Sequence, residues 1–293
     1  MRLPKLEVLL LLLPLAIYIG AFFGYPLILL FSYSLTDESL TKVTVSYVGL
    51  HNYFEIFAKS YYLSIIGRTF LYAGLVVGVS LVLGLAYALV VESIGHKLIG
   101  TGVKTIIMLP MLLLPVAGGV AWRYFLLERY GWINFLIEML GGQRYAWMND
   151  TKYAFWWVCL TDIWGWTPFM FLILLAGLRT LPRETFEAGQ IDGASGWSLF
   201  RHITLPLLKP IIYIASTIKL LDTYKAFDYL WVMTQGGPGS SSTTLNLEGY
   251  LVSFWHMNIG FGSAIGVVTM LFPVAMVTAF LIVRRVKGRV SVT

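Results

Sequence analysis

Charged side chains interrupt one long apolar run in the last third of the sequence. Lys219, Asp222, Lys225 and Asp228 follow one another at steps of three. Each charge is costly in lipid, so we expect all four to face a bundle interior or a wet cavity and to pair along one helix. The ladder either stabilises that helix or lines a solute path, in which Asp222, Tyr224 and Asp228 exchange hydrogen bonds with sugar hydroxyls.

A second set of side chains combines aromatic rings with an acid. The set consists of Trp122, Tyr124, Asp162, Trp164 and Trp166. Sugars stack their apolar C–H faces on aromatic rings, and carboxylates accept hydrogen bonds from their hydroxyls. The combination therefore suits a neutral carbohydrate as ligand. A lipid-facing or interfacial position is the alternative for each single ring.

Patterns for catalysis or metal binding are missing from the sequence. The four histidines are scattered, and the single cysteine, Cys159, lies in an apolar run where a small buried hydrophobe is expected. Residues 95–101 lack the Lys-Ser/Thr pair of a Walker A loop. We expect no catalytic residue, no metal and no cofactor bound by this chain, and any ATP hydrolysis to take place in a separate subunit. A membrane-embedded enzyme is disfavoured.

The composition indicates a membrane protein. Apolar residues make up 58% of the chain and charged residues 12%, with a mean hydropathy of +0.76, whereas soluble domains have about 25% charged residues. A net charge of +6 would suggest nucleic acid for a soluble protein. Here basic residues held at the cytoplasmic face of a membrane explain it better, so the lipid bilayer is expected as a partner and nucleic acid is not.

Six apolar runs reach the roughly 20 residues that cross a hydrocarbon core. The expected spans are residues 9–33, 67–91, 106–127, 155–178, 210–233 and 260–283. The first run is too long for a cleaved signal peptide and is interpreted as a retained span. The predicted fold is all-α, a single polytopic membrane domain over residues 1–293.

The distribution of basic residues predicts the orientation of these spans. One set of short loops carries Arg2, Lys5, Lys97, Lys104, Arg179, Arg183, Arg201, Lys209, Arg284, Arg285, Lys287 and Arg289. Loops of this kind face the cytoplasm, which places both termini there. On the opposite side, residues 235–239 give a strong turn signal, for which we expect an ordered turn.

A polar segment, residues 179–209, separates the fourth and fifth expected spans. Good helix formers predict a helix over residues 183–191, and Asp192-Gly193 predicts a turn in which glycine adopts a positive φ. A second short helix over residues 196–203 is expected to end at Leu205-Pro206. From residue types alone, this helix-turn-helix is either an ordinary interfacial loop or a rigid knob on which a partner docks.

The same segment resembles the conserved cytoplasmic loop of ABC importer permeases. The matching residues are Glu187, Ala188, Asp192, Gly193, Ala194, Phe200, Ile203, Leu205 and Pro206, and Gly189 replaces the second alanine of the pattern. The resemblance implies a type I ABC importer permease fold of six transmembrane helices with a cytoplasmic coupling helix-turn-helix. It also implies that Glu187 anchors this loop to an ATPase subunit and that Gly193 permits the sharp turn. The other residues expected at the coupling surface are Ala188, Gly189, Asp192, Ala194, Phe200 and Pro206.

Further stretches resemble the carbohydrate-importer permeases of the maltose, trehalose and glycerol-3-phosphate type, on the first-permease side of the pair. These stretches are residues 48–53, 164–169, 175–178, 227–228, 234–238 and 263–267. The resemblance implies a second permease subunit, two ATPase subunits that bind ATP and Mg, and an extracytoplasmic sugar-binding protein. The expected function is ATP-driven import of a sugar or oligosaccharide across the plasma (inner) membrane by alternating access. The alternatives are an ion-gradient-driven secondary transporter and an importer of a glycerol-phosphate-type solute.

Overall fold

The computed structural model describes residues 5–94 and 98–290. Within them every named element is a helix, and one isolated bridge joins Thr36 to Tyr47. The expected all-α class is therefore confirmed. Arg2, Lys97 and both chain ends, for which a cytoplasmic position was expected, lie outside the described residues.

The chain divides into two compact units, one formed by residues 1–66 with 245–293 and the other by residues 67–244. The helices of the first unit are α1 (Lys5–Ile19), η1 (Gly20–Gly24), α2 (Tyr25–Ser34), α3 (His51–Ala58), α13 (Leu245–Tyr250), η4 (Leu251–Trp255) and α14 (Ile259–Val290). In its core Ile56, Ile65, Leu245 and Ile265 are fully buried. The long helix α4 (Ser60–Ile94) begins in this unit and continues into the second.

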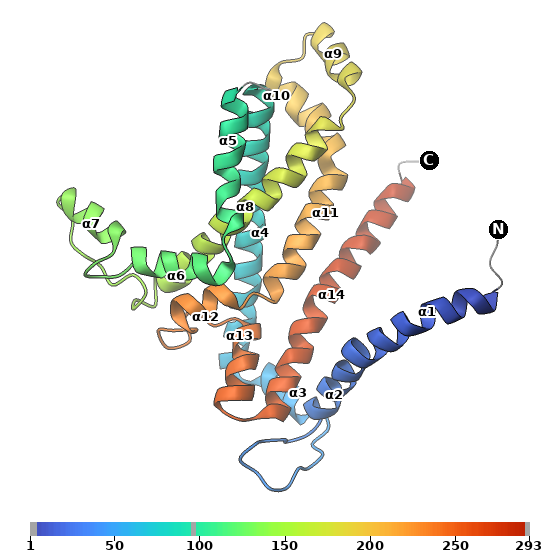
Figure 1. Cartoon of the computed structure of the whole chain (residues 1–293), viewed down its shortest axis with the longest axis vertical. Helices are drawn as coiled ribbons and strands as arrows, with labels where there is room; N and C mark the ends of the chain where they lie inside the picture. Colours follow the sequence, from blue (N-terminus) through green and yellow to red (C-terminus); the bar gives the residue numbers. More distant parts are fainter. Residues whose placement is uncertain (1–4, 95–97, 291–293) are drawn as a thin grey trace. The chain divides into compact units, whose positions relative to one another are not determined.

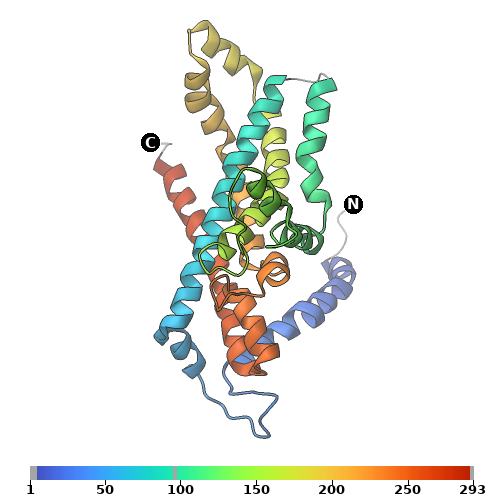
Figure 2. The ribbon, with the colours of Figure 1, turned by 90° about the vertical axis from the view of Figure 1, so that its left-hand side faces the viewer.

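The second unit contains the candidate site and the polar segment. Its further helices are α5 (Leu98–Met108), η2 (Leu109–Leu112), α6 (Pro115–Phe125), α7 (Trp132–Met139), α8 (Ala154–Arg179), α9 (Arg183–Ile191), α10 (Gly196–Leu199), η3 (Phe200–Thr204), α11 (Leu205–Tyr224) and α12 (Asp228–Thr234). Figures 1 and 2 both show α9 and α10 at the end of this unit where α4 ends and α5 begins.

Among the described residues, four helices are long and apolar enough to cross a membrane, or five if one bent pair counts as a span. The four are residues 10–34, 60–94, 154–179 and 196–224, and residues 259–275 form a shorter apolar helix. Six spans were expected from the sequence. In the third expected span the chain bends by 96° between Gly100–Leu112 and Pro115–Phe125. Leu114 is extended there (ψ 141°) because the residue before a proline disfavours the helical conformation.

The fifth expected span differs from the structure at both ends. Residues 196–224 form one continuous helical stretch, so Pro206 does not end a helix as the sequence predicted. A π-helical turn, η3, ends at Thr204, two residues before Pro206, and such a widened turn accommodates the missing N–H and the bulk of the proline ring. At the other end α11 stops at Tyr224 instead of Met233, and a separate helix, α12, starts at Asp228.

The close crossing of α4 and α8 sets the framework of the second unit. A Cβ added at Gly84 of α4 would lie 2.6 Å from the Met170 Cβ and 2.8 Å from the backbone nitrogen of Phe171, both on α8. Met170 and Phe171 are fully buried in the adjacent core, together with Ala88 and Leu174. Backbone atoms cannot move aside as a flexible side chain can, so this contact requires glycine.

We predict that Gly84→Val lowers the stability of the protein, because overpacking a tight contact costs about 1–3 kcal/mol. Cys159 is the single cysteine of the chain and is 3% exposed, so a thiol-reactive dye reports unfolding on heating. The midpoint of labelling should fall by several degrees. Gly78→Val, on the same helix with nothing within 4 Å of the added Cβ, is the matched control. Equal midpoints for the two variants would contradict the prediction.

Candidate functional site

Lys219 lies at the centre of a buried group of polar side chains. Its Nζ is 2.9 Å from Oδ1 of Asp162 and 3.4 Å from Oδ2 of Asp222, and it lies 4.4 Å from the ring centre of Trp166. The hydroxyl of Tyr72 donates to the second oxygen of Asp162 at 2.5 Å. Tyr72, Asp162 and Lys219 are each 1% exposed. The charged cluster thus joins α4, α8 and α11 inside the bundle.

Helix periodicity explains how the sequence assembles this cluster. Asp162 and Trp166 are four residues apart on α8, and Lys219 and Asp222 are three apart on α11, so each pair shares one helix face. Two carboxylates surround one ammonium group, and each group has a partner. Removing a partner from a buried ion pair costs about 3–5 kcal/mol because it leaves a desolvated charge. The cluster therefore fixes the packing of three helices.

The expected charge ladder is confirmed over its first three members only. Lys219 and Lys225 both contact Asp222, the latter at 3.7 Å. Asp228 does not share a helix with the other three, because α11 ends at Tyr224 and Asp228 is the first residue of α12. A carboxylate at that position is favoured by the helix dipole, which gives Asp228 a local structural role.

The aromatic candidates line two separate pockets. Trp166 lines a pocket of 220 Å³ with Gly165 and Tyr229. Trp122 and Trp164 contact each other edge to face at 5.8 Å between ring centres, and they line a largely apolar pocket of 490 Å³. The structure therefore places Trp166 beside the buried charges and pairs Trp122 with Trp164 elsewhere in the same unit.

The remaining candidates differ in accessibility. The Asp162 carboxylate is buried and occupied by Tyr72 and Lys219. Tyr224 is 2% exposed, and its ring packs against Phe70 at 5.9 Å. Tyr124 and Asp228 are exposed, and neither takes part in the ion-pair cluster. The side chain of Asp222 keeps 27% of its surface exposed, so its carboxylate is the accessible acid of the cluster.

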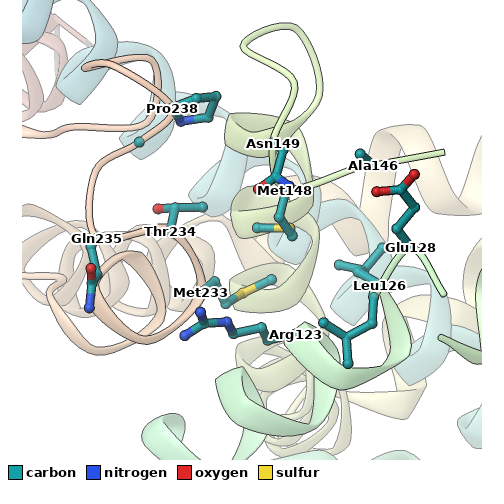
Figure 3. A pocket seen from close by; sticks show the side chains of 12 residues that line it. Arg123, Leu126, Glu128, Ala146, Met148, Asn149, Met233, Thr234, Gln235 and Pro238 are labelled. Atoms are coloured by element: carbon teal, nitrogen blue, oxygen red, sulfur yellow. The ribbon is translucent and has the colours of Figure 1, made fainter. Parts of the chain in front are cut away.

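A further pocket, of 240 Å³, lies beside α6 and α12 (Figure 3) and was not identified from the sequence. It is lined by Arg123, Leu126, Leu127, Glu128, Ala146, Met148, Asn149, Met233, Thr234, Gln235, Gly237 and Pro238. One guanidinium nitrogen of Arg123 donates to the carbonyl of Val232 at 3.0 Å, which orients the side chain at the pocket edge. The turn signal over residues 235–239 and Arg123 beside Trp122 were the available indications in the sequence.

The turn beside this pocket is ordered, as the sequence predicted. Gln235 and Gly236 have positive φ values of 52° and 88°. Ser242 is fully buried, and its hydroxyl contacts Thr234 Oγ1 at 2.7 Å and the carbonyl of Gly237 at 2.9 Å. A guanidinium nitrogen of Arg68 donates to the carbonyl of Thr243 at 3.1 Å. These contacts fix the rim of the pocket formed by residues 234–238.

The opposite rim is held by one buried amide. Asn134 is 1% exposed; its side-chain oxygen accepts from the Tyr145 backbone N–H and from the Trp147 indole, each at 3.0 Å, and its amide donates to the Tyr145 carbonyl. Nearby, the Tyr145 hydroxyl and the Lys152 backbone N–H donate to Asp150 and lower the pKa of this carboxyl. Because the pKa of Asp150 is lowered, its ionised carboxylate stabilises the rim at every pH above the usual pKa of an aspartate. This stabilisation is lost as the pH falls through the lowered pKa.

The polar segment forms the predicted helix-turn-helix. Helix α9 ends in a Schellman motif, in which the N–H of Ala194 donates to the carbonyl of Gly189 and that of Gly193 to the carbonyl of Gln190. Gly193 has φ +77°, which confirms the predicted turn conformation. The Ser195 hydroxyl then caps α10 by accepting from the Ser198 N–H at 3.3 Å.

Gly189, the departure from the family pattern, lies where α9 packs against the following helix. A Cβ at this position would be 2.8 Å from Cδ2 of Leu199 and 2.9 Å from Cδ1 of Ile203. Both neighbours are flexible side-chain ends, so the contact is close without being rigid. Glu187, Ala188 and Asp192 are exposed beside it.

Two large apolar side chains are also exposed on this hairpin. Ile191 is 86% exposed and Trp197 is 67% exposed, and the Trp197 ring rests against Phe200 at 5.4 Å between ring centres. Exposed apolar groups gathered beside polar ones mark interaction surfaces. Ile191 was not among the candidates from the sequence, although it follows directly on Gln190 in the matched segment.

In the described part of the chain, no three His, Cys, Asp or Glu side chains come together to hold a metal ion.

We predict that Lys219→Met strongly destabilises the protein, by about 3–5 kcal/mol, because it leaves Asp162 without its buried counter-charge. Asp162→Asn combined with Lys219→Met should regain part of this loss. Thermal unfolding followed by intrinsic tryptophan fluorescence measures both effects. Lys225→Met removes an exposed charge of the same cluster and is the control. A loss equal to that of the control would show that the buried pair does not hold the helices.

Sequence comparison identifies relatives that extend over nearly the whole chain. The family model described as "Binding-protein-dependent transport system inner membrane component" matches residues 80–290. The trehalose/maltose transport system permease protein MalF of Thermococcus litoralis is 32% identical over 282 residues, which cover 94% of this chain and 92% of the relative. The sulfoquinovosyl glycerol transport system permease protein SmoG of Agrobacterium fabrum is 32% identical over 284 residues, with coverage of 97% and 92%.

The fold agrees with these relatives. A chain from the crystal structure of a bacterial ABC transporter involved in the import of the acidic polysaccharide alginate superposes with a TM-score of 0.83 at 20% identity, covering 96% of both chains. At this identity the likeness establishes the fold alone, which is that of an ABC importer permease. The long match to the family model and the relatives above 30% identity establish the family. The chain is a transport subunit and belongs to the binding-protein-dependent transport system inner membrane components, the permeases of ABC transporters.

Proposed function

We propose that the chain is the transmembrane subunit of an ATP-driven importer that moves a sugar or oligosaccharide across the plasma membrane. The observation that carries this proposal is the exposed hairpin of α9 and α10, which presents Glu187 and Asp192 together with two uncovered apolar side chains, Ile191 and Trp197. Exposed apolar side chains beside polar ones mark interaction surfaces, so we expect a partner to cover this hairpin. The two relatives described above and the superposed structure are named for the transport or import of carbohydrates.

The partners follow from what the chain itself lacks. Its sequence has no Walker A loop, so ATP and Mg belong to two ATPase subunits, one of which docks on the hairpin. A second permease completes the pathway through the bilayer, and an extracytoplasmic binding protein delivers the solute. The positive-inside rule places the hairpin and both termini on the cytoplasmic side, in a multi-pass inner-membrane protein of six spans.

The continuous helix through residues 196–224 supplies a route for force. Helix α10 of the hairpin and Lys219 lie on this one helical stretch, so a displacement of α10 reaches the buried cluster without a break in the helix. Helix α8 leads into α9 through only Thr180, Leu181 and Pro182. Movement of the ATPases thus acts on α8 and α11 together, which is the motion that alternating access requires.

The charge balance of the cluster favours a neutral solute. Lys219 already faces two carboxylates at 2.9 and 3.4 Å, so no unmatched positive charge remains there for a phosphate. This disfavours the glycerol-phosphate alternative, and family membership disfavours a secondary transporter. Asp222 and Trp166 are the best placed of the candidate solute contacts, because Asp222 is accessible and Trp166 lines a pocket next to it. Asp162 would act by positioning Lys219.

ATP-dependent uptake of a panel of labelled neutral sugars tests the function directly, in proteoliposomes that contain the whole complex and its binding protein. We predict that Glu187→Lys abolishes this uptake, because it reverses the charge that the hairpin presents to the ATPase. ATPase subunits should no longer co-purify with the variant. Glu184→Lys, one turn earlier on α9 and also exposed, is the matched control and should retain most uptake. Full assembly and uptake with Glu187→Lys would rule out the proposed docking role.

We predict that Asp222→Asn raises the KM for sugar uptake about tenfold, the effect of losing one hydrogen bond to a charged group, and lowers the unfolding temperature less than Asp162→Asn does, because Lys219 keeps its nearer partner, Asp162. Asp162→Asn should lower the unfolding temperature more strongly and should leave the KM of the folded fraction nearly unchanged. Initial uptake rates over a range of sugar concentrations separate KM from kcat. An unchanged KM for Asp222→Asn would remove this residue from the solute path.

A further inference from the structure

A pocket larger than the three described above lies at the base of the hairpin, away from the buried charge cluster. Its volume is 670 Å³. It is lined by the ends of α4 and α8, by one face of α9 at Arg183, Phe186 and Gln190, and by Thr204 of η3. Any ligand in it touches both the membrane-spanning helices and the proposed coupling helix.

The lining of this pocket is amphipathic. Leu89, Leu178, Leu181 and Phe186 contribute apolar surface, while Arg179, Arg183 and Ser93 contribute polar groups. Helix α4 ends at Ile94 and α8 at Arg179, so the pocket lies where apolar spans leave the hydrocarbon. A ligand of matching chemistry has an anionic head and an apolar extension.

The charges in the pocket favour an anion. Nε of Arg179 is 3.0 Å from Oε2 of Glu92, which balances these two lining charges. Arg183 forms no ion pair within the described residues and leaves one net positive charge. It is also the first residue of α9, whose N-cap, Pro182, supplies no side-chain acceptor. The unpaired amides of a helix start add to the attraction for an anionic oxygen.

We propose that this pocket binds the phosphate headgroup of an anionic phospholipid, with the adjoining leucines and Phe186 against the start of its acyl chains. The bound phosphate lies between Arg183 and Arg179. The lipid thereby ties α9 to the ends of α4 and α8 and stiffens the hairpin that the proposed function assigns to the ATPase. Basic pockets between helices at the cytoplasmic boundary recognise anionic lipids in this way.

Native mass spectrometry of the full complex, released from nanodiscs of phosphatidylcholine with phosphatidylglycerol, tests the proposal by counting retained lipid. Wild type should retain phosphatidylglycerol over phosphatidylcholine. Arg183→Gln should weaken retention about fivefold, since one basic residue near the surface contributes about 1 kcal/mol. Ser93→Trp should fill the pocket and abolish retention. Arg201→Gln, an exposed arginine of the same segment that does not line the pocket, is the matched control.

Several outcomes would overturn the proposal. Equal retention of both lipids would exclude recognition of charge, and equal losses for Arg183→Gln and Arg201→Gln would exclude this pocket. Displacement by excess inorganic phosphate would show a simple anion site, and retention by the chain alone but not by the complex would show that a partner subunit occupies it. Hydrogen exchange of residues 183–191 should slow when phosphatidylglycerol is present. Lipid retention is measured without sugar or ATP. The lipid proposal can therefore fail while the import function holds, and the import function can fail while the lipid proposal holds.

Discussion

The buried charge of Lys219 is the constraint on which the packing of the second unit depends. An ammonium group that is 1% exposed must be neutralised within the protein, and the chain meets this need with Asp162 from α8 and Asp222 from the next turn of α11. Tyr72 from α4 then satisfies the second oxygen of Asp162. Three helices are therefore held in one relative arrangement by side chains that would be unfavourable separately.

The same cluster connects a rigid interior to an accessible edge. Trp166 lies against Lys219 and also lines a pocket beside Tyr229. Asp222 contacts Lys219 on one side and the exposed Lys225 on the other. A change in the position of α11 would therefore alter the contacts of both Lys219 and Asp222.

Mechanical continuity distinguishes the hairpin from an ordinary surface loop. The π-helical turn η3 lets the chain pass Pro206 without a break, so α10, η3 and α11 form a single lever. The Schellman motif at Gly193 fixes the other arm, and the Gly189 contact with Leu199 and Ile203 holds the two arms together. The pocket at the base of the hairpin is lined by both arms as well as by the ends of α4 and α8.

The sequence by itself determined the features that depend on local chemistry. The composition and the long apolar runs indicated the all-α membrane class, Asp192-Gly193 predicted the turn with positive φ, and the matched residues around Glu187 indicated the family. Only the tertiary structure decided that the Asp162 carboxylate pairs with Tyr72 and Lys219, that Asp228 belongs to a separate helix, and that Arg123 and Asn134 shape a further pocket. Those outcomes depend on contacts between residues as much as 109 positions apart, on a bend before Pro115 and on a π-turn before Pro206. No local pattern specifies such contacts, because their free energy depends on which helices pack together.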